Sequence, residues 1–303
     1  MTNNLLEPIT QLFRPQAPLS ACEFTPRHVI VAGVNSSRKR IASKAVAGLP
    51  PHALIGSLAE KNVVDPQAVL DRLNEATGQA GFKKGHEIGI VIPDDAARIS
   101  FLTAESLPAS AEERSAFIRW KLKKTVPFEV DTAQIAFSVM GTRVTGENKG
   151  TDLLVALSPR TVIEEYERMV DSLGFESGYV IPSSLAALKM MPAPSGDMLF
   201  LKIAPGCIAT TVFQNGRPEF YRKVAEMPLY DAIYPTLMYY QDKLGGAGLT
   251  GLTVCGYDRD IQPEVADLQH KLSVPVQRLG PAGVEDIYKS ALGAVEVVWA
   301  NLT

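Results

Sequence analysis

The chain has 303 residues and a mass of 32.8 kDa, the length of about two domains at ~150 residues each. Lys and Arg total 30 against 33 for Asp and Glu, which gives a formal net charge of −3. Such a chain has no excess of positive charge to attract nucleic acid. The longest apolar runs, such as 153–157 and 198–201, are far shorter than the ~20 residues of a transmembrane helix. We therefore expect neither a nucleic-acid-binding protein nor a membrane span.

The cysteines and histidines give no sign of a metal site. Cys22, Cys207 and Cys255 are odd in number and far apart, which fits neither a disulfide framework nor a zinc site. The four histidines never fall at the close helical spacing of a metal-binding pair. The first 18 residues lack the sustained apolar segment of a secretory signal. These features indicate a protein of the reducing cytoplasm.

The first elements of the chain follow from prolines, glycines and short apolar runs. Residues 1–23, interrupted by prolines, are expected to form an arm outside the first domain. Residues 28–34 predict a strand that ends in the polar turn 35–37. That turn either closes a hairpin, which we favour, or binds an anion through its backbone N–H groups. Asp65 followed by proline predicts a helix that ends at Gly78.

The middle of the chain alternates strands and helices. Ser110 and Glu113 form a capping-box pattern, which predicts a basic helix ending before Pro127. Its charges are interpreted as a solvent-facing surface or, alternatively, as a patch for anionic lipid or an acidic partner. A helix over 160–173 places three glutamates opposite an apolar stripe, where they should face solvent. The remaining predicted elements are strands at 87–92, 98–102, 134–140, 152–157 and 179–181 and a short helix at 184–190.

The second half begins with three antiparallel strands. Asn215-Gly216 between two apolar runs is a strong hairpin signal. The order of elements predicts an α/β domain over residues 194–303. Its predicted elements are strands at 198–203, 208–214, 219–224, 252–255 and 274–278 and helices at 229–244, 264–272 and 284–293.

This order, repeated in looser form before residue 197, resembles the duplicated core of the actin-like ATPase superfamily. The basic helix ending in Val126-Pro127-Phe128 and the later 183–188 segment resemble PilM-type type IV pilus assembly proteins and the cytoplasmic domains of GspL-type secretion proteins. The resemblance implies an α/β fold, an actin-like (RNase H-like) duplicated core. It implies a first domain over 24–193, with a small α+β subdomain inserted at about 86–176.

The resemblance also implies a nucleotide site, from which this sequence departs. Ala32 and Lys202 stand where active relatives have carboxylates, and Tyr257 replaces the second glycine of the adenosine-side turn. Without those carboxylates, Mg²⁺ loses its protein ligands. We expect a degenerate site that at most binds ATP and Mg²⁺, with no catalytic residue and no metal ligand. The corresponding residues are Gly33, Asn35, Ser36, Ser37, Lys202, Gly206 and Gly256.

The family resemblance implies a scaffold rather than an enzyme. Such a protein lies in the cytoplasm, peripheral to the inner membrane, and binds the N-terminal tail of a bitopic PilN-like protein. The groove for the tail would lie beside the inserted subdomain and use apolar pockets and backbone pairing. Other pilus or secretion platform proteins are further candidate partners. The candidate partner-binding residues are Arg98, Trp120, Pro127, Phe128 and Ser183.

Two alternatives stay open at this point. One is an active ATPase or sugar-kinase-like phosphotransferase in which Asp94, Asp95 or Asp258 supplies relocated metal ligands. The other is a GspL-type secretion receptor domain, which is normally followed by a membrane span.

Overall fold

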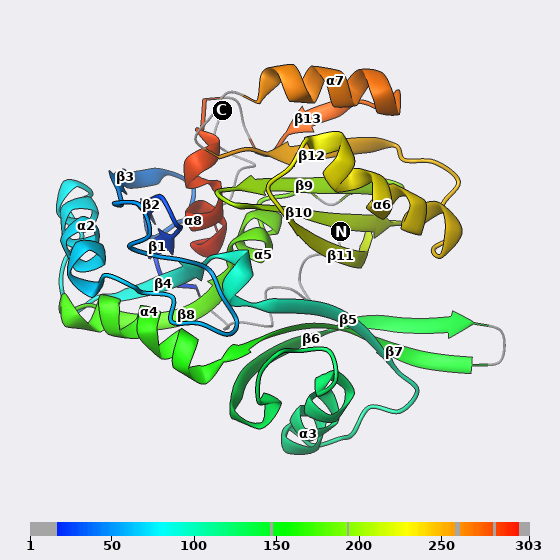
Figure 1. Cartoon of the computed structure of the whole chain (residues 1–303), viewed down its shortest axis with the longest axis horizontal. Coiled ribbons are helices and arrows are strands. Elements are labelled where there is room, and N and C mark those ends of the chain that lie inside the picture. The colour runs from blue at the N-terminus through cyan, green and yellow to red at the C-terminus, as the bar shows by residue number, and fades with distance from the viewer. Residues whose placement is uncertain (1–16, 146–147, 193, 258–260, 281–282, 297–303) are drawn as a thin grey trace.

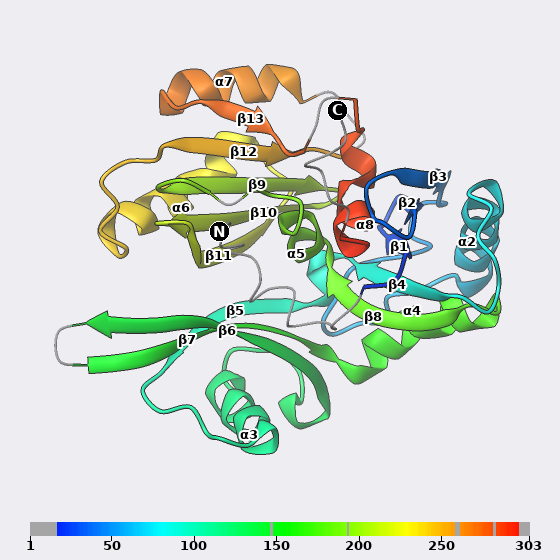
Figure 2. The ribbon, with the colours of Figure 1, turned by 180° about the vertical axis from the view of Figure 1, so that it is seen from behind.

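The computed structural model describes residues 17–145, 148–192, 194–257, 261–280 and 283–296. Two five-stranded sheets lie on either side of a pair of short helices, and a three-stranded sheet projects below them (Figure 1). The view from behind shows the same three parts (Figure 2). This arrangement confirms the predicted α/β class. None of the helices in the described ranges is long and apolar enough to cross a membrane.

The first domain is built on a mixed sheet whose middle strand comes earliest in the chain. Helices α2 (Pro66–Gln79) and α4 (Arg160–Ser172) cover one face of it. Asp65 Oδ1 accepts a hydrogen bond from the Ala68 N–H and caps α2, as its sequence predicts. In spatial order the strands are β3 (Ile41–Gly48), β2 (His28–Val34), β1 (Ser20–Phe24), β4 (Glu87–Ile92) and β8 (Glu176–Pro182).

Strand β1 corrects the expected N-terminal arm. We expected residues 1–23 to lie outside the domain, but Ser20–Phe24 pairs with β2 on one side and β4 on the other. The strand was missed because it has five residues and contains Glu23, which breaks its apolar pattern. Strand β3 was also missed, and its pairing with β2 shows that the turn at 35–37 closes a hairpin.

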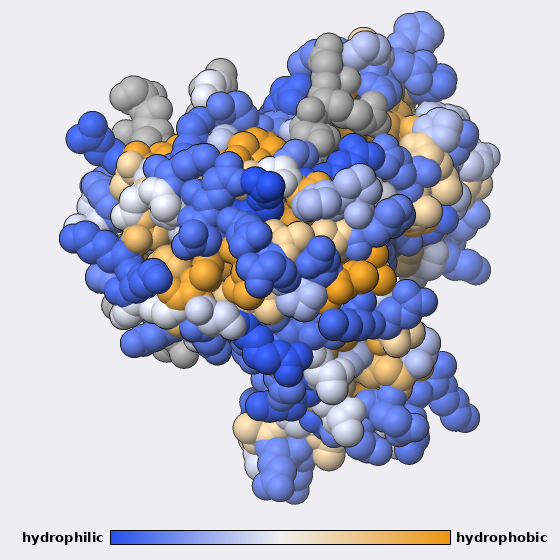
Figure 3. Space-filling model, turned by 60° about the vertical axis from the view of Figure 1, so that its left-hand side comes forward, coloured by the Kyte–Doolittle hydropathy of each residue, from blue (hydrophilic) through white to orange (hydrophobic). Residues whose placement is uncertain are grey.

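The inserted subdomain is smaller than expected. Its three-stranded sheet has the order β5-β7-β6 and packs against α3 (Ala111–Leu122). Both β4 and α4 fall inside the expected range of 86–176, yet they belong to the first domain, because β4 pairs with β1 and β8. In the space-filling view the subdomain projects below the main body (Figure 3). Its strands are β5 (Arg98–Ala104), β6 (Ala133–Thr145) and β7 (Asn148–Pro159).

The second domain repeats the mixed sheet. The predicted hairpin is present, with Asn215 at φ 50° and Gly216 at φ 78° in the turn between β10 and β11. Helices α6 (Leu229–Asp242) and α7 (Gln262–Leu272) cover one face. In spatial order the strands are β11 (Arg217–Ala225), β10 (Cys207–Gln214), β9 (Met198–Ala204), β12 (Gly251–Cys255) and β13 (Val276–Arg278).

Two short helices, α5 (Ser183–Leu188) and α8 (Lys289–Ala294), fill the space between the two large sheets (Figure 1). Their backbones touch, because a Cβ atom on Gly293 would lie 1.9 Å from the Ala186 carbonyl oxygen. Helix α8 follows the second-domain sheet in sequence but packs on β1, β2 and β4 of the first domain. The two domains therefore share one apolar core.

Candidate functional site

A cluster of buried polar side chains lies in the layer between the two large sheets. Side chains alternate between the two faces of a strand. On β1, Cys22 and Phe24 pack in the core under α2 and α4, so Glu23 points to the opposite face. On β9, Leu201 and Ile203 pack in the core under α6 and α7, so Lys202 points to the opposite face. The two charged residues therefore meet in the middle layer.

The contacts of Lys202 join the two domains. Its Nζ atom lies 4.0 Å from Glu23 Oε1, and both side chains are 1% exposed. The same Nζ donates a hydrogen bond of 2.6 Å to Ser290 Oγ on α8. Ser183 Oγ donates to Glu23 Oε1 at 2.6 Å and lies 3.0 Å from Ser290 Oγ. One strand of each large sheet and both central helices thus contribute to a single network.

A second buried carboxylate, Asp94, lies beside this network in the short 3₁₀ helix η1 (Asp94–Ala96). The backbone N–H and the hydroxyl of Ser184 both donate to Asp94 Oδ1, at 2.9 and 2.7 Å. Lys223 Nζ, from the second domain, donates to the Asp94 carbonyl oxygen at 2.7 Å and pairs with Asp95 at 2.8 Å. Glu23 Oε2 and Asp94 Oδ2 accept no hydrogen bond from the described residues.

The cluster holds Lys202 in its charged form. Burial on its own would lower the pKa of Lys202, but the surrounding acidic groups, including Cys255, Glu23 and Asp94, outweigh it and raise the pKa. Burial raises the pKa of Glu23 and of Asp94, although the Lys202 charge opposes both shifts. Glu23 therefore has its counter-charge in Lys202, and the charges of both Lys202 and Lys223 act on Asp94.

Tyr257, at the end of β12, makes a further polar link between the domains. Its side chain is buried, and its hydroxyl lies 2.8 Å from Thr25 Oγ1 and 3.2 Å from His28 Nδ1. Thr25 and His28 flank the turn between β1 and β2 of the first domain. The ring of Tyr257 thus fills space between the domains that a second glycine in this turn would leave open.

The backbone amides around this region are already hydrogen bonded. Thr25 Oγ1 accepts from the N–H groups of Arg27 and His28, at 3.3 and 2.8 Å. The Gly206 N–H, in the turn between β9 and β10, donates to Glu226 Oε2 at 3.3 Å. A phosphate held by backbone amides needs such N–H groups to be free. The two facing turns border a cleft of about 460 Å³. The amides just named already donate to protein oxygens, so they are not available to a phosphate in this cleft.

The charges and contacts of the interdomain layer determine whether it can hold a magnesium–nucleotide complex. Lys202 places an ammonium group beside Glu23, where a second positive ion would be repelled. The Gly256 N–H donates to Asp286 Oδ2 at 2.8 Å, and a Cβ at this glycine would contact Asp286 and Ile261. Among the described residues, no group of three His, Cys, Asp or Glu side chains is placed to hold a metal ion. The residues present do not fit the complex.

The seven residues expected at a nucleotide site do not form one site. Lys202, Gly206 and Gly256 lie at or near the interdomain layer. Gly33 lies at the end of β2 that is far from the turn at 25–27. The pairing shows this, because Val29 lies opposite Phe24 next to that turn, whereas Gly33 lies opposite Ser20. Asn35, Ser36 and Ser37 follow it in the β2–β3 turn, where Asn35 Oδ1 accepts from the N–H groups of Lys39 and Arg40. The turn that faces Gly206 is the one after β1, at residues 25–27.

The acidic residues considered for an enzyme have different positions. Asp94 is buried beside Lys202, and Asp95 lines the interdomain cleft while pairing with Lys223. Asp258 lies outside the described residues. Both described aspartates therefore lie next to a lysine ammonium group, which would repel a metal ion.

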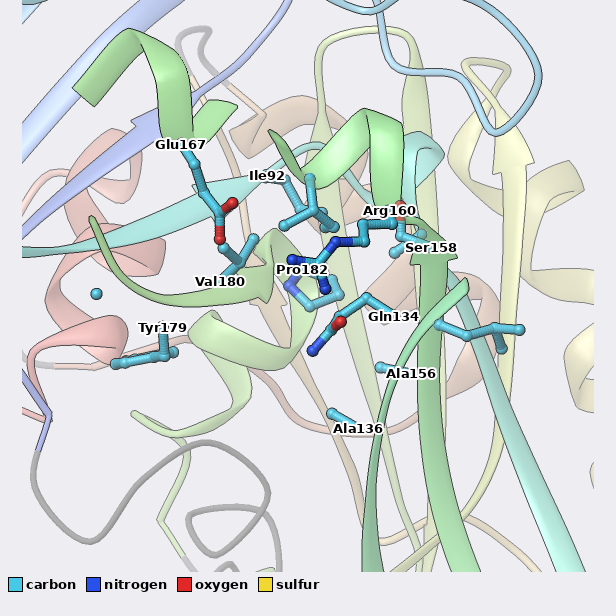
Figure 4. A pocket seen from close by; sticks show the side chains of 14 residues that line it. Ile92, Gln134, Ala136, Ala156, Ser158, Arg160, Glu167, Tyr179, Val180 and Pro182 are labelled. Carbon is cyan, nitrogen blue, oxygen red and sulfur yellow. The ribbon is translucent and has the colours of Figure 1, made fainter. Parts of the chain in front are cut away.

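A separate groove of about 280 Å³ lies between the first domain and the inserted subdomain. Figure 4 shows Arg160 and Glu167 of α4 above it and Gln134 of β6 across from them. Within the described chain, β8 pairs only with β4, and β6 pairs only with β7. Each strand therefore has one free edge in its sheet, and both contribute to the groove. Its wall residues include Gln134, Ala136, Ile163, Tyr179, Val180 and Pro182.

The groove combines apolar walls with a few polar groups. Arg160 Nε pairs with Glu164 at 2.9 Å, and both side chains are exposed. Partial burial, together with Asp171, raises the pKa of Glu167. The Tyr179 ring contributes an apolar surface and is itself buried. A small apolar channel with polar groups at its rim is typical of a site for an extended peptide.

The five residues expected to bind a partner do not line this groove. Arg98 lines a different cavity, between β5 and β11. Trp120 is 69% exposed on α3, with Lys121 Nζ above its ring. Pro127 is exposed, and Phe128 packs on the core of the inserted subdomain. Ser183 is buried and bonded to Glu23, so it has no surface to offer a partner. The sequence predicts the strands and the helix that carry the residues lining the groove, but it contains no motif that marks these residues as a binding site.

Comparisons with known proteins identify the fold. No protein-family model and no curated protein matches the chain. A structure described as the PilM-PilN type IV pilus biogenesis complex has a TM-score of 0.74 at 14% identity, covering 94% of this chain and all of that one. The cytoplasmic domain of EpsL, from the type II secretion system of Vibrio cholerae, gives 0.52 at 10% identity, with 94% and 97% covered.

A third solved structure supports the same assignment. A Bacteroides thetaiotaomicron protein of unknown function, described as having an actin-like ATPase fold, gives a TM-score of 0.52 at 12% identity, with 93% of this chain and 96% of that one covered. At these identities the likeness establishes the fold and leaves activity open. The chain therefore has an actin-like fold of the arrangement seen in PilM-type pilus proteins and in the EpsL cytoplasmic domain.

Proposed function

We propose that this protein is a PilM-like scaffold of a type IV pilus assembly platform. In this role it lies in the cytoplasm and reaches the inner membrane through a PilN-like membrane protein, whose N-terminal tail it binds. The full-length likeness to the PilM-PilN structure supports a pilus setting. The likeness to the EpsL domain is weaker, so we place the secretion alternative second.

The groove between β6 and β8 is the observation that carries this proposal. An extended peptide can add to a free strand edge through backbone hydrogen bonds, while its alternate side chains enter pockets. Here two free edges, one from each sheet, lie beside the same channel. The proposed tail lies along this channel as an added strand, with apolar side chains against Ala136 and Val180. Arg160 and Glu167, at the rim of the groove, bind polar groups of the tail and so fix its position along the channel.

The polar layer between the domains favours a scaffold over an enzyme. Phosphoryl transfer depends on a metal ion and on groups that position phosphate. In this layer the amides named above and one oxygen each of Glu23 and Asp94 pair with other protein groups, while the second oxygen of each carboxylate accepts no hydrogen bond from the described residues. No specific contact of the described residues favours the ATPase or phosphotransferase alternative.

Binding of a fluorescent peptide tests the proposal. The peptide is the N-terminal tail of a PilN-like protein from the same organism, titrated with the purified chain. Ala136→Arg would place a long side chain in the groove, and we expect it to weaken binding at least about tenfold, or ~1.4 kcal/mol. Val139→Arg is the matched control, because Val139 is 43% exposed on the same strand and does not line the groove.

The control should bind within about twofold of the original chain, since its site is unchanged. Equal losses in both variants, or no loss in Ala136→Arg, would place the peptide elsewhere. Absence of any peptide binding by the original chain would contradict the proposed function itself.

A further inference from the structure

We propose that Lys202 is a built-in cation that joins the two domains in place of a metal ion and nucleotide. The domains would then be held together in every condition in which Lys202 is charged, with no ligand required. This inference concerns the interdomain layer and does not depend on the peptide groove.

Buried charges of opposite sign lie on the two sides of the interdomain layer. The first domain contributes two carboxylates, Glu23 and Asp94, whose side chains are almost completely buried. A buried carboxylate without a compensating charge is strongly destabilising. Lys202 comes from the second domain, and its ammonium group supplies the compensation. Separating the domains would leave charges on both sides without their partners.

The Lys202 ammonium group is also held in place by hydrogen bonding. Ser290 accepts from Lys202 Nζ, and Ser183 connects Ser290 to Glu23. These two serines lie on the central helices, whose backbones are in contact at Gly293 and Ala186. The lysine is therefore fixed by groups that are themselves held in place by close packing.

Groups that a nucleotide would have to contact in this layer already bond to other protein groups. The Tyr257 ring lies between the domains and bonds to Thr25, and the nearby turn amides are already paired. A nucleotide entering this layer would have to break these bonds and overcome repulsion between its metal ion and Lys202. In the closed state the Lys202 ammonium group already lies beside Glu23, so this carboxylate has its counter-charge without a ligand.

Thermal unfolding of the original chain is the first test. A ligand that binds only the folded state raises the melting temperature. We expect millimolar Mg²⁺ with ATP to raise it by less than about 1 °C. A saturable increase of several degrees would show that nucleotide does bind the folded chain and would overturn the inference.

Replacing the lysine tests its role as a cation. We expect Lys202→Ala to lower the melting temperature by at least about 5 °C, because the buried Glu23 carboxylate loses its counter-charge while Lys223 stays near Asp94. It also opens a space beside Glu23. Millimolar n-propylammonium or Mg²⁺, added separately, should restore at least about half of the loss. No restoration by either cation would overturn the inference.

Lys202→Met is the matched control. Methionine fills much of the same space without charge, so it should lose stability but gain nothing from either cation. Equal restoration in both variants would mean that the cations act elsewhere and would also overturn the inference.

A double variant without either charge keeps the inference testable if the single variants fail to fold. Glu23→Gln combined with Lys202→Met removes both charges and keeps the approximate volumes. If the two side chains act as a pair, the double variant should be more stable than Lys202→Met alone. A double variant less stable than both single variants would contradict the pairing.

Discussion

The interdomain layer and the groove beside the inserted subdomain are both places where two parts of the chain meet, but they are built differently. In the layer, the charged groups face each other and share serine hydroxyls. In the groove, two strands keep an edge that no described strand pairs with, and most of the side chains between them are small or apolar, with Gln134, Arg160 and Glu167 as polar members. The difference separates two roles. A region whose polar groups are mostly paired with one another contributes to stability, whereas a region with free backbone edges can bind another chain.

This comparison predicts that stability depends on the layer far more than on the groove. The largest effect should come from Gly293→Ala, because the added Cβ would lie 1.9 Å from the Ala186 carbonyl oxygen and force α5 and α8 apart. We expect the free energy of unfolding in urea to fall by at least about 2 kcal/mol. Gly48→Ala is the control, since a Cβ there would meet no atom within 4 Å. If both changes cost the same, the helix contact does not hold the domains together.

The next largest effect should come from Tyr257→Phe. The change removes only the hydroxyl that bonds to Thr25 and His28 and leaves the ring in place. We expect a loss of about 1 kcal/mol in the free energy of unfolding, measured by urea denaturation. An unchanged midpoint would show that this link between the domains adds little to the closed state.

A smaller effect, confined to acid, should come from Asp286. Burial on its own would raise the pKa of Asp286, but the hydrogen bonds from Lys289, Gly256 and Arg278 outweigh it and lower the pKa. A carboxyl group with a lowered pKa stabilises the fold above its unfolded pKa of about 3.9, and the stabilisation is lost as the pH falls through the folded pKa. Urea denaturation should therefore show stability falling below pH ~4. Asp286→Asn should flatten that part of the curve; an identical slope would rule Asp286 out as its source.

The smallest effect on stability should come from the groove. Arg160→Ala removes an exposed ion pair with Glu164, and such pairs contribute little. We expect the free energy of unfolding to change by no more than about 0.5 kcal/mol, while peptide affinity falls. A large loss of stability here would contradict the separation between the two regions.

Elements with local signals were predictable from the sequence. Asp65 caps α2, Ser110 Oγ accepts from the Glu113 N–H at 3.1 Å to cap α3, and Asn215-Gly216 closes its hairpin. Each of these depends on residues within a few positions of one another, so one stretch of sequence contains the whole signal.

Features that depend on distant pairing were harder to predict. Strand β1 is a strand because β2 and β4 lie beside it, and the local composition around Glu23 does not show this. Because β1 was missed, the turn after it was not considered, and the expected nucleotide turn was assigned to residues 35–37 after β2. In the structure, the residues that face Gly206 across the interdomain cleft belong to the turn at 25–27.

The exposure of one charged residue was also predicted wrongly, at a place where a loop packs against helix α4. Glu165 was expected to face solvent with its neighbours on α4. It is 9% exposed, and its Oε2 accepts hydrogen bonds from the N–H groups of Asn62 and Val63. Helical periodicity describes one helix and does not show that a loop a hundred residues earlier covers its polar face.

The position of α8 has a consequence for how this protein is made. Helix α8 covers β1, β2 and β4, yet its first residue, Lys289, is translated 197 residues after Ile92, the last residue of these strands. During synthesis, that face of the first sheet stays uncovered until residue 294 has left the ribosome. Ribosome-bound chains shorter than this should offer chaperones an apolar sheet face, and they should lose that binding abruptly once α8 emerges.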